Sequence, residues 1–113
     1  MYDLPGGGCD GGESPEVTAL RELQEETSYT SSESLIPLGK AVRDVYRIGD
    51  TYYYLLLNCH PMVERFPNND DREMIEVELH DMSEMIEYAK QGLVSDAAAL
   101  LFAKDKLREL EGN

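Results

Sequence analysis

The sequence has little of what several classes of binding site require. It has no tryptophan, only two histidines and only two cysteines among its 113 residues. Cys9 and Cys59 fit neither a zinc-ligand spacing nor a disulfide framework, so we interpret them as free thiols. His60 and His80 are isolated and are interpreted as ordinary strand-end or loop residues. A structural zinc site is therefore not expected.

Basic residues are also scarce. Ten lysines and arginines stand against 23 aspartates and glutamates, which gives a formal net charge of −13. Such a surface repels phosphate backbones, so the composition argues against nucleic-acid binding through a basic patch. It also repels a polyanionic small-molecule substrate unless metal cations intervene.

Long apolar runs are missing as well. The longest, Tyr52 to Leu57, has the length of a strand and falls far short of the ~20 residues of a membrane span. The N-terminus lacks the basic region and apolar stretch of a signal peptide. We therefore expect a cytoplasmic protein of one globular domain, residues 1–113, with no membrane partner.

The order of apolar and turn-forming residues predicts a mixed α/β or α+β fold. Ser14 is the expected cap of the first helix, with Pro15 in its first position, and Gly92 is expected to end the second. The expected elements are a loop over 6–12, a helix over 15–27, a hairpin of strands 35–48 and 51–59 with a turn at 49–50, a loop over 60–72, a half-buried strand over 75–80, a helix capped by Ser83 that runs to about residue 91, and a last helix capped by Ser95 or Asp96.

The first helix combines an apolar stripe with clustered carboxylates. At 100° per residue, Glu25 and Glu26 both lie within about 60° of Glu22, and Arg21 stands beside Glu25. A solvated acidic face is the simpler interpretation of such a run. The opposite side is expected to face a core through its apolar residues, Val17, Leu20 and Leu23.

Two features favour a divalent cation on the acidic side. Glu22 and Glu26 are like charges four residues apart, which destabilises an isolated helix by a few tenths of a kcal/mol. The loop over 6–12 runs directly into this helix, and its glycines let backbone carbonyls approach a ligand closely, next to Glu13. Oxygen ligands of this kind suit Mg²⁺ or Mn²⁺ rather than zinc.

These residues resemble the signature of the Nudix hydrolase family. That signature is G-x5-E-x7-R-E-U-x-E-E-x-G-U, where U is a bulky aliphatic residue. Ser28 replaces its last glycine, and a left-handed serine there costs roughly 1–2 kcal/mol without disturbing the carboxylates. Tyr29 stands at the last aliphatic position, and the flanking LPGGG and EET are typical of the family. The matching residues are Gly7, Glu13, Arg21, Glu22, Leu23, Glu25 and Glu26.

The resemblance implies a metal-dependent hydrolase that cleaves the diphosphate of a nucleoside diphosphate linked to another moiety. It implies Glu22 and Glu26 as ligands of Mg²⁺ or Mn²⁺, and the carbonyl of Gly6 as a backbone ligand. Glu25 is then a further ligand or the partner of a metal-bound water, and Arg21 orients a glutamate. The cations would also offset the repulsion between an acidic protein and an anionic substrate.

The general base differs between members of the family, being a helix glutamate in some and an acid of a later loop in others. The segment EMIEVELHDMSEMIEYAKQGLVSDAAALLF resembles the ADP-ribose pyrophosphatase branch, which implies ADP-ribose or a nucleotide sugar as substrate. Glu73 is then the best match to the loop acid, and the alternatives are Glu64, Asp70 and Asp71. The proline that such enzymes often carry after the signature is missing from AVRDVYRIG. Ligand contacts and ordinary strand positions stay open for Arg43, Tyr46 and Arg47.

Only three residues precede Leu4, where the family has several strands. The resemblance therefore predicts a Nudix-type mixed sheet with flanking helices that lacks its N-terminal strands. Open strand edges invite pairing, so we expect a homodimer or a higher assembly. The alternatives to an active enzyme are a Nudix-like nucleotide-binding module without turnover and a domain fragment that needs its missing strands supplied.

Overall fold

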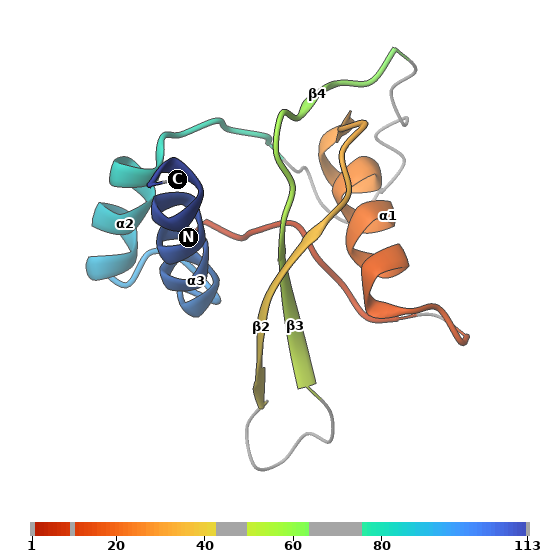
Figure 1. Ribbon diagram of the computed structural model, residues 1–113, viewed down its shortest axis with the longest axis horizontal. Coiled ribbons are helices and arrows are strands. Elements are labelled where there is room, and N and C mark those ends of the chain that lie inside the picture. Colours follow the sequence, from red (N-terminus) through yellow and green to blue (C-terminus); the bar gives the residue numbers. More distant parts are fainter. Residues whose placement is uncertain (1, 10, 43–49, 64–75, 113) are drawn as a thin grey trace. The chain divides into compact units, whose positions relative to one another are not determined.

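The computed structural model describes residues 2–9, 11–42, 50–63 and 76–112. Helices and antiparallel strands occur in the same chain, which confirms the predicted mixed α+β class. In chain order the elements are α1 (Pro15–Thr27), β1 (Tyr29–Thr30), β2 (Ile36–Val42), β3 (Asp50–Leu55), β4 (His60–Pro61), α2 (Met82–Lys90) and α3 (Ala98–Glu111) (Figure 1). None of the helices in these ranges has the length and apolar character that crossing a membrane requires.

The chain divides into two compact units, which are described separately. One unit comprises Met1–Leu4, Ile36–Leu55 and Asp81–Asn113, and so contains β2, β3, α2 and α3. The other comprises Pro5–Leu35 and Leu56–His80, and contains α1, β1 and β4. The glycine-rich segment and the glutamate helix therefore belong to the same unit.

The first unit is built on the antiparallel pair of β2 and β3. Lys40 lies opposite Tyr52 and Gly39 opposite Tyr53, so these two pairs point to opposite faces of the ribbon. This pairing confirms the predicted hairpin. β3, however, begins at Asp50, which we expected in the turn, and the strand ends at Leu55 rather than at Cys59.

One face of this ribbon packs against α3. The ring of Phe102 lies against Gly39, where a Cβ atom would come within 3.3 Å of it, and the φ angle of Gly39 is 157°. The rings of Tyr53 and Phe102 pack together with their centroids 5.9 Å apart. The buried apolar residues of this unit, on α3 and just before it, are Val94, Ala99, Leu100 and Ala103.

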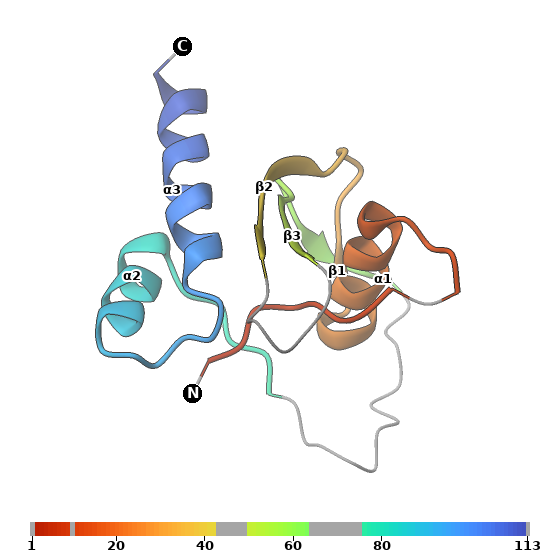
Figure 2. The ribbon, with the colours of Figure 1, turned by 90° about the horizontal axis from the view of Figure 1, so that it is seen from below.

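The two C-terminal helices form as predicted, but their first residues differ (Figure 2). Asp81, not Ser83, caps α2: its carboxylate accepts from the backbone N–H of Glu84, and the Glu84 carboxylate accepts from the N–H of Asp81. This reciprocal capping box satisfies two backbone donors at once, which a cap at Ser83 does not achieve. Gly92, with φ at 75°, follows the end of the helix as predicted.

Neither predicted cap holds the start of α3. Its N-cap residue is Ala97, which has no capping side chain. The Ser95 hydroxyl donates instead to the carboxylate of Asp3, and Asp96 takes a left-handed backbone with φ at 53°. The segment before α3 is engaged by the N-terminal residues, because the Tyr2 N–H donates to the Leu93 carbonyl at 2.6 Å.

The second unit places a short strand pair after α1. β1 pairs with β4, with Tyr29 opposite Pro61 and Thr30 opposite His60, so His60 lies in a short strand at the start of what we expected to be a loop. The predicted strand over 75–80 is wrong for its described part, since residues 76–80 form no regular element and Leu79 is 74% exposed. Alternation of apolar and acidic residues alone makes no strand without a partner for the backbone, and the described residues provide none there.

Candidate active site

The helix α1 begins and ends where the sequence predicts. The Ser14 hydroxyl accepts from the backbone N–H of Val17 at 3.3 Å, and Pro15 follows as the first helical residue. At the other end Ser28 takes the left-handed conformation, with φ at 59° and ψ at 29°, and its N–H donates to the Gln24 carbonyl. The segment before Ser14 is thereby held at the N-terminus of the glutamate helix.

The apolar stripe expected on α1 is only partly correct. Leu20 and Leu23 are half-buried, but Val17 is 55% exposed. The one buried residue of the helix is Thr18, at 3% exposure, which stands four residues before Glu22 and so on the acidic side. The one buried position of the helix therefore lies on the polar side, where the side chains pair with one another.

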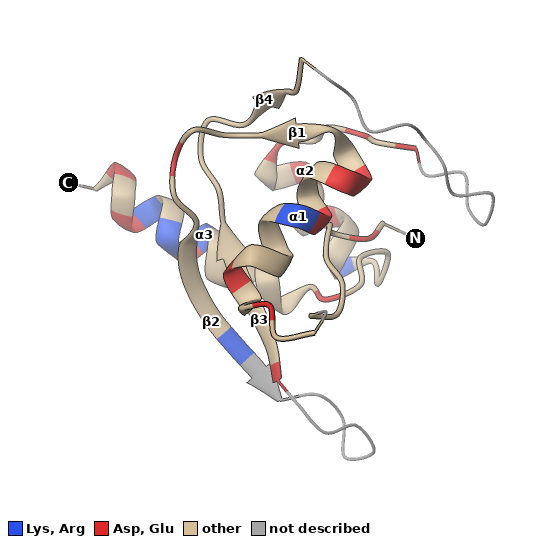
Figure 3. Cartoon of the chain, turned by 90° about the vertical axis from the view of Figure 1, so that its right-hand side faces the viewer, with Lys and Arg blue, Asp and Glu red and all other residues tan. Residues whose placement is uncertain are grey.

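Arg21 is the centre of that pairing. Its Nε and Nη2 donate to the two carboxylate oxygens of Glu13 at 3.0 and 2.9 Å, which is a bidentate ion pair. Its Nη1 donates to Glu22 at 3.1 Å and to Glu25 at 3.2 Å. Figure 3 shows basic and acidic positions next to each other on α1. One guanidinium therefore connects three carboxylates from the loop and the helix.

The same contacts fix the charge of the guanidinium. The hydrogen bond from Arg21 to Glu13 raises the pKa of Arg21 above its ordinary value, desolvation opposes this rise, and the negative charges of Glu13, Glu22 and Glu25 add to it. Arg21 therefore carries a positive charge, as arginine side chains in proteins do.

The glycine loop lies against two of the helix carboxylates. A Cβ atom on Gly7 would lie 2.5 Å from Oε1 of Glu22, so only a glycine leaves that carboxylate its present place. The N–H of Gly6 donates to Oε1 of Glu26 at 3.4 Å. The structure thus brings Gly6 together with Glu26, and Gly7 with Glu22, while Arg21 connects Glu22 to Glu25.

These oxygen donors suit a divalent cation in their chemistry. Carboxylate and backbone carbonyl oxygens are the ligands that Mg²⁺ and Mn²⁺ prefer, and two of the carboxylates lie against the same short backbone stretch. Of these two carboxylates, Glu22 is also bound by Arg21. In the described ranges, no three side chains of His, Cys, Asp or Glu stand close enough together to form a preformed metal cage.

Several predicted residues cannot be placed. The proposed loop base Glu73 and its alternatives Glu64, Asp70 and Asp71 lie outside the described residues, as do Arg43, Tyr46 and Arg47. Two features were not expected from the sequence alone. These are the direct pairing of Glu13 with Arg21 and the buried hydroxyl of Thr18. The sequence indicates the role of Thr18 only by placing a hydroxyl residue on the glutamate side of the helix.

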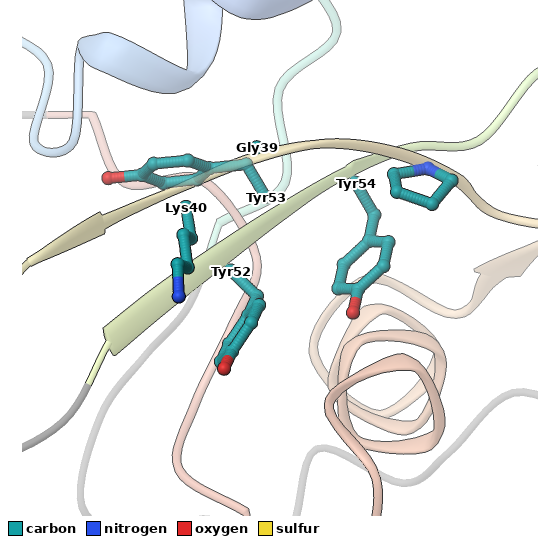
Figure 4. A pocket seen from close by; sticks show the side chains of 6 residues that line it. Gly39, Lys40, Tyr52, Tyr53 and Tyr54 are labelled. Carbon is teal, nitrogen blue, oxygen red and sulfur yellow. The ribbon is translucent and has the colours of Figure 1, made fainter.

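A separate pocket lies on the β2–β3 ribbon of the other unit (Figure 4). Figure 4 shows Tyr52 and Tyr54 on one side of the ribbon and Tyr53 on the other. Lys40 is 3.3 Å from the carboxylate of Asp50. The pocket contains none of the predicted site residues, and its lining consists of Pro37, Gly39, Lys40, Tyr52, Tyr53 and Tyr54.

Comparison with known proteins decides the family. The family model of the NUDIX domain matches residues 1–102. The chain belongs to the NUDIX family. It is 30% identical over 89 residues to a protein of Bacillus subtilis (strain 168) named ADP-ribose pyrophosphatase, and the match covers 77% of this chain and 48% of that protein. This NUDIX chain therefore spans about half the length of that curated relative, and the resemblance seen in the sequence is confirmed.

Proposed function

We propose that this NUDIX protein is a metal-dependent hydrolase of nucleoside diphosphates linked to another moiety, with ADP-ribose or a nucleotide sugar as substrate. The observation that carries the proposal is the convergence of Glu22 and Glu26 on the backbone of Gly6 and Gly7. The name of the Bacillus subtilis relative, ADP-ribose pyrophosphatase, supports this choice of substrate.

In this proposal Glu22, Glu26 and the Gly6 carbonyl hold Mg²⁺ or Mn²⁺, and Glu25 is a further ligand or holds a water. The bound cation supplies positive charge that neutralises the diphosphate and lowers the pKa of a water molecule. Arg21 positions the ligands, because its guanidinium binds Glu22 and Glu25 while Glu13 holds it from the loop. The cation also offsets the repulsion between the substrate and a chain of net charge −13.

The water needs a base that removes its proton. Glu25 is our first candidate within the described residues, since it is the most exposed carboxylate bound to Arg21, at 46% side-chain exposure. Glu73 is the second candidate, proposed from its position in the sequence alone. Replacing each by glutamine and comparing the pH profiles of turnover at saturating Mg²⁺ separates them, because the metal site is then filled and loss of the base removes the acidic limb of the profile.

The direct test is turnover of ADP-ribose with Mg²⁺, followed by ³¹P NMR. Glu22→Gln and Glu26→Gln should each lower the rate on the order of 100-fold or more, since even outer partners of metal ligands are worth 10–100-fold. Glu16→Gln, an exposed acid in the first turn of the same helix, is the matched control and should stay within about twofold, a surface change away from the site. Unchanged turnover in a Glu25→Gln, Glu26→Gln double variant contradicts the mechanism.

A second candidate function is a nucleotide-binding module without turnover. It is favoured by the ion pairs of Arg21, which already compensate the charges of Glu22 and Glu25. Calorimetry with ADP-ribose distinguishes the two functions. Binding without any product over hours supports the module, and rapid product formation rejects it.

We also propose that the protein acts as a homodimer. α3 covers one face of the β2–β3 ribbon, but neither strand has a second strand partner in the described part of the chain, and open strand edges invite pairing. Sedimentation should give twice the mass of one chain. A monodisperse monomer with cooperative melting contradicts the dimer.

A further inference from the structure

Thr18 is the one buried polar residue among those that the structure describes. Only 3% of it is exposed, although its neighbour Val17 is more than half exposed. Its hydroxyl donates to Oε1 of Glu13 at 3.1 Å. A buried hydroxyl keeps its carboxylate partner, because an unpaired polar group away from water is costly.

This hydrogen bond sets the orientation of the Glu13 carboxylate. Oε1 of Glu13 accepts from Thr18 and also from Nη2 of Arg21, at 2.9 Å, while Oε2 accepts from Nε of Arg21. A bidentate pair needs the carboxylate and the guanidinium nearly coplanar, so a third donor on one oxygen restricts the rotation of both groups. Thr18 and Arg21 are three residues apart on α1, so both side chains can donate hydrogen bonds to Glu13.

Arg21 in turn contacts two of the predicted metal ligands. Its Nη1 contacts Glu22 and Glu25, whose oxygens a cation would also need. If Glu13 held the guanidinium less firmly, Arg21 and the two carboxylates that it contacts would take up more orientations, and fewer of these would suit a cation. The hydrogen bonds that Thr18 and Arg21 donate to Glu13 are therefore expected to affect the affinity for a cation.

We propose that Thr18 is a positioning residue of the metal site: through Glu13 and Arg21, its hydroxyl holds Glu22 and Glu25 ready for a divalent cation. The inference rests on the proposed function, because it concerns the same carboxylates. Thr18 touches neither the cation nor the substrate in this arrangement. Its effect is on the affinity for the cation, by way of the two groups that it orients.

The test compares Thr18→Val, which keeps the shape and removes the hydroxyl, with Thr18→Ser, which keeps the hydroxyl. Mn²⁺ affinity is measured by electron paramagnetic resonance, and thermal unfolding is followed by circular dichroism on the same samples. Thr18→Val should bind Mn²⁺ about 10-fold more weakly, the lower end of the range for outer partners of metal ligands. Thr18→Ser should stay within about twofold of the wild-type protein because it conserves the hydrogen bond. If Thr18→Val does not fold, Thr18→Ala removes the same hydroxyl with less bulk.

A purely structural role of Thr18 would lower the melting temperature and leave the Mn²⁺ affinity of the folded protein unchanged, and that result overturns the inference. Absence of Mn²⁺ binding by the wild-type protein overturns it as well. The proposed function fails separately: if the wild-type protein binds Mn²⁺ but produces nothing from ADP-ribose, hydrolysis is rejected. The comparison of Thr18→Val with Thr18→Ser still decides the role of Thr18.

Discussion

The Glu22 carboxylate occupies the space that a side chain at position 7 would need, and Gly7 leaves that space open. The nearest atoms to a Cβ built on Gly7 all belong to the carboxyl end of Glu22, while a Cβ on Gly8 meets nothing within 4 Å. The two glycines are neighbours in one loop, yet only one of them is needed for packing. A glycine at this position is explained by the space that the Glu22 carboxylate occupies.

Gly7→Ala should therefore move the Glu22 carboxylate and leave the fold nearly intact, because the end of a flexible side chain can shift. We expect Mn²⁺ affinity and turnover to fall about 10-fold, as for other changes that misplace a metal ligand, with little change in melting temperature. Gly8→Ala is the matched control and should bind Mn²⁺ like the wild-type protein. Equal Mn²⁺ affinities for the two variants would show that the contact with Glu22 has no part in metal binding.

Residue identities predicted how the helix residues of the candidate site are arranged on α1, and the contacts of that helix became known only from the structure. The spacing of Arg21, Glu22, Glu25 and Glu26 was sufficient to place them on one side of a helix. The spacing did not reveal that Glu13 folds back onto Arg21, since the path of a glycine-rich loop is set by contacts rather than by periodicity. Thr18 was missed because one hydroxyl in a helix carries no pattern of its own.

Helix ends were predictable to within a few residues, and strands only where they paired. Ser14 and Pro15 fixed the start of α1, because serine and proline each have a specific role there. The start of α2 was misplaced by two residues, because Asp81 and Ser83 are both good caps and only Asp81 has Glu84 three residues later. The alternating segment over 76–80 was wrongly predicted to be a strand. A strand needs a partner strand for its backbone hydrogen bonds, and the sequence of the segment does not indicate whether one is present.

The cap of α2 makes a prediction at the level of this element. Asp81→Ala removes both the acceptor for the Glu84 N–H and the partner of the Ser83 hydroxyl, so it should lower the free energy of unfolding by about 1 kcal/mol. Asp81→Asn keeps a capping oxygen and should lose only a few tenths of a kcal/mol, since both residues cap well. Urea unfolding followed by circular dichroism measures both. Equal losses for the two variants would assign the effect to the charge, which both remove, rather than to capping.

The whole molecule carries an excess of thirteen negative charges, and its ion pairs offset that excess only locally. Lys90 with Glu87 and Lys106 with Glu109 are exposed pairs within single helices, and pairs of this kind contribute little. We therefore expect repulsion between like charges to outweigh these ion pairs in its effect on overall stability.

Salt should consequently stabilise this protein. Raising NaCl from 0.01 to 0.1 M shortens the screening length from about 30 to about 10 Å, which weakens the long-range repulsion more than the close ion pairs. We expect the melting temperature to rise by several degrees, measured by scanning calorimetry without added divalent cations. Sucrose at equal osmolality controls for effects other than screening. A melting temperature that falls with salt would mean that the ion pairs outweigh the excess charge.

The single guanidinium of Arg21 has one more consequence, for how substitutions combine. Because Glu13, Glu22 and Glu25 share it, removing one carboxylate changes the environment of the other two. The effects of replacing these residues will not add, and a double-mutant cycle between Glu13 and Glu25 should show a coupling of about 0.5 kcal/mol or more even though the two belong to different segments. Whether a substitution is tolerated at one of these three carboxylates therefore depends on which residues occupy the other two positions.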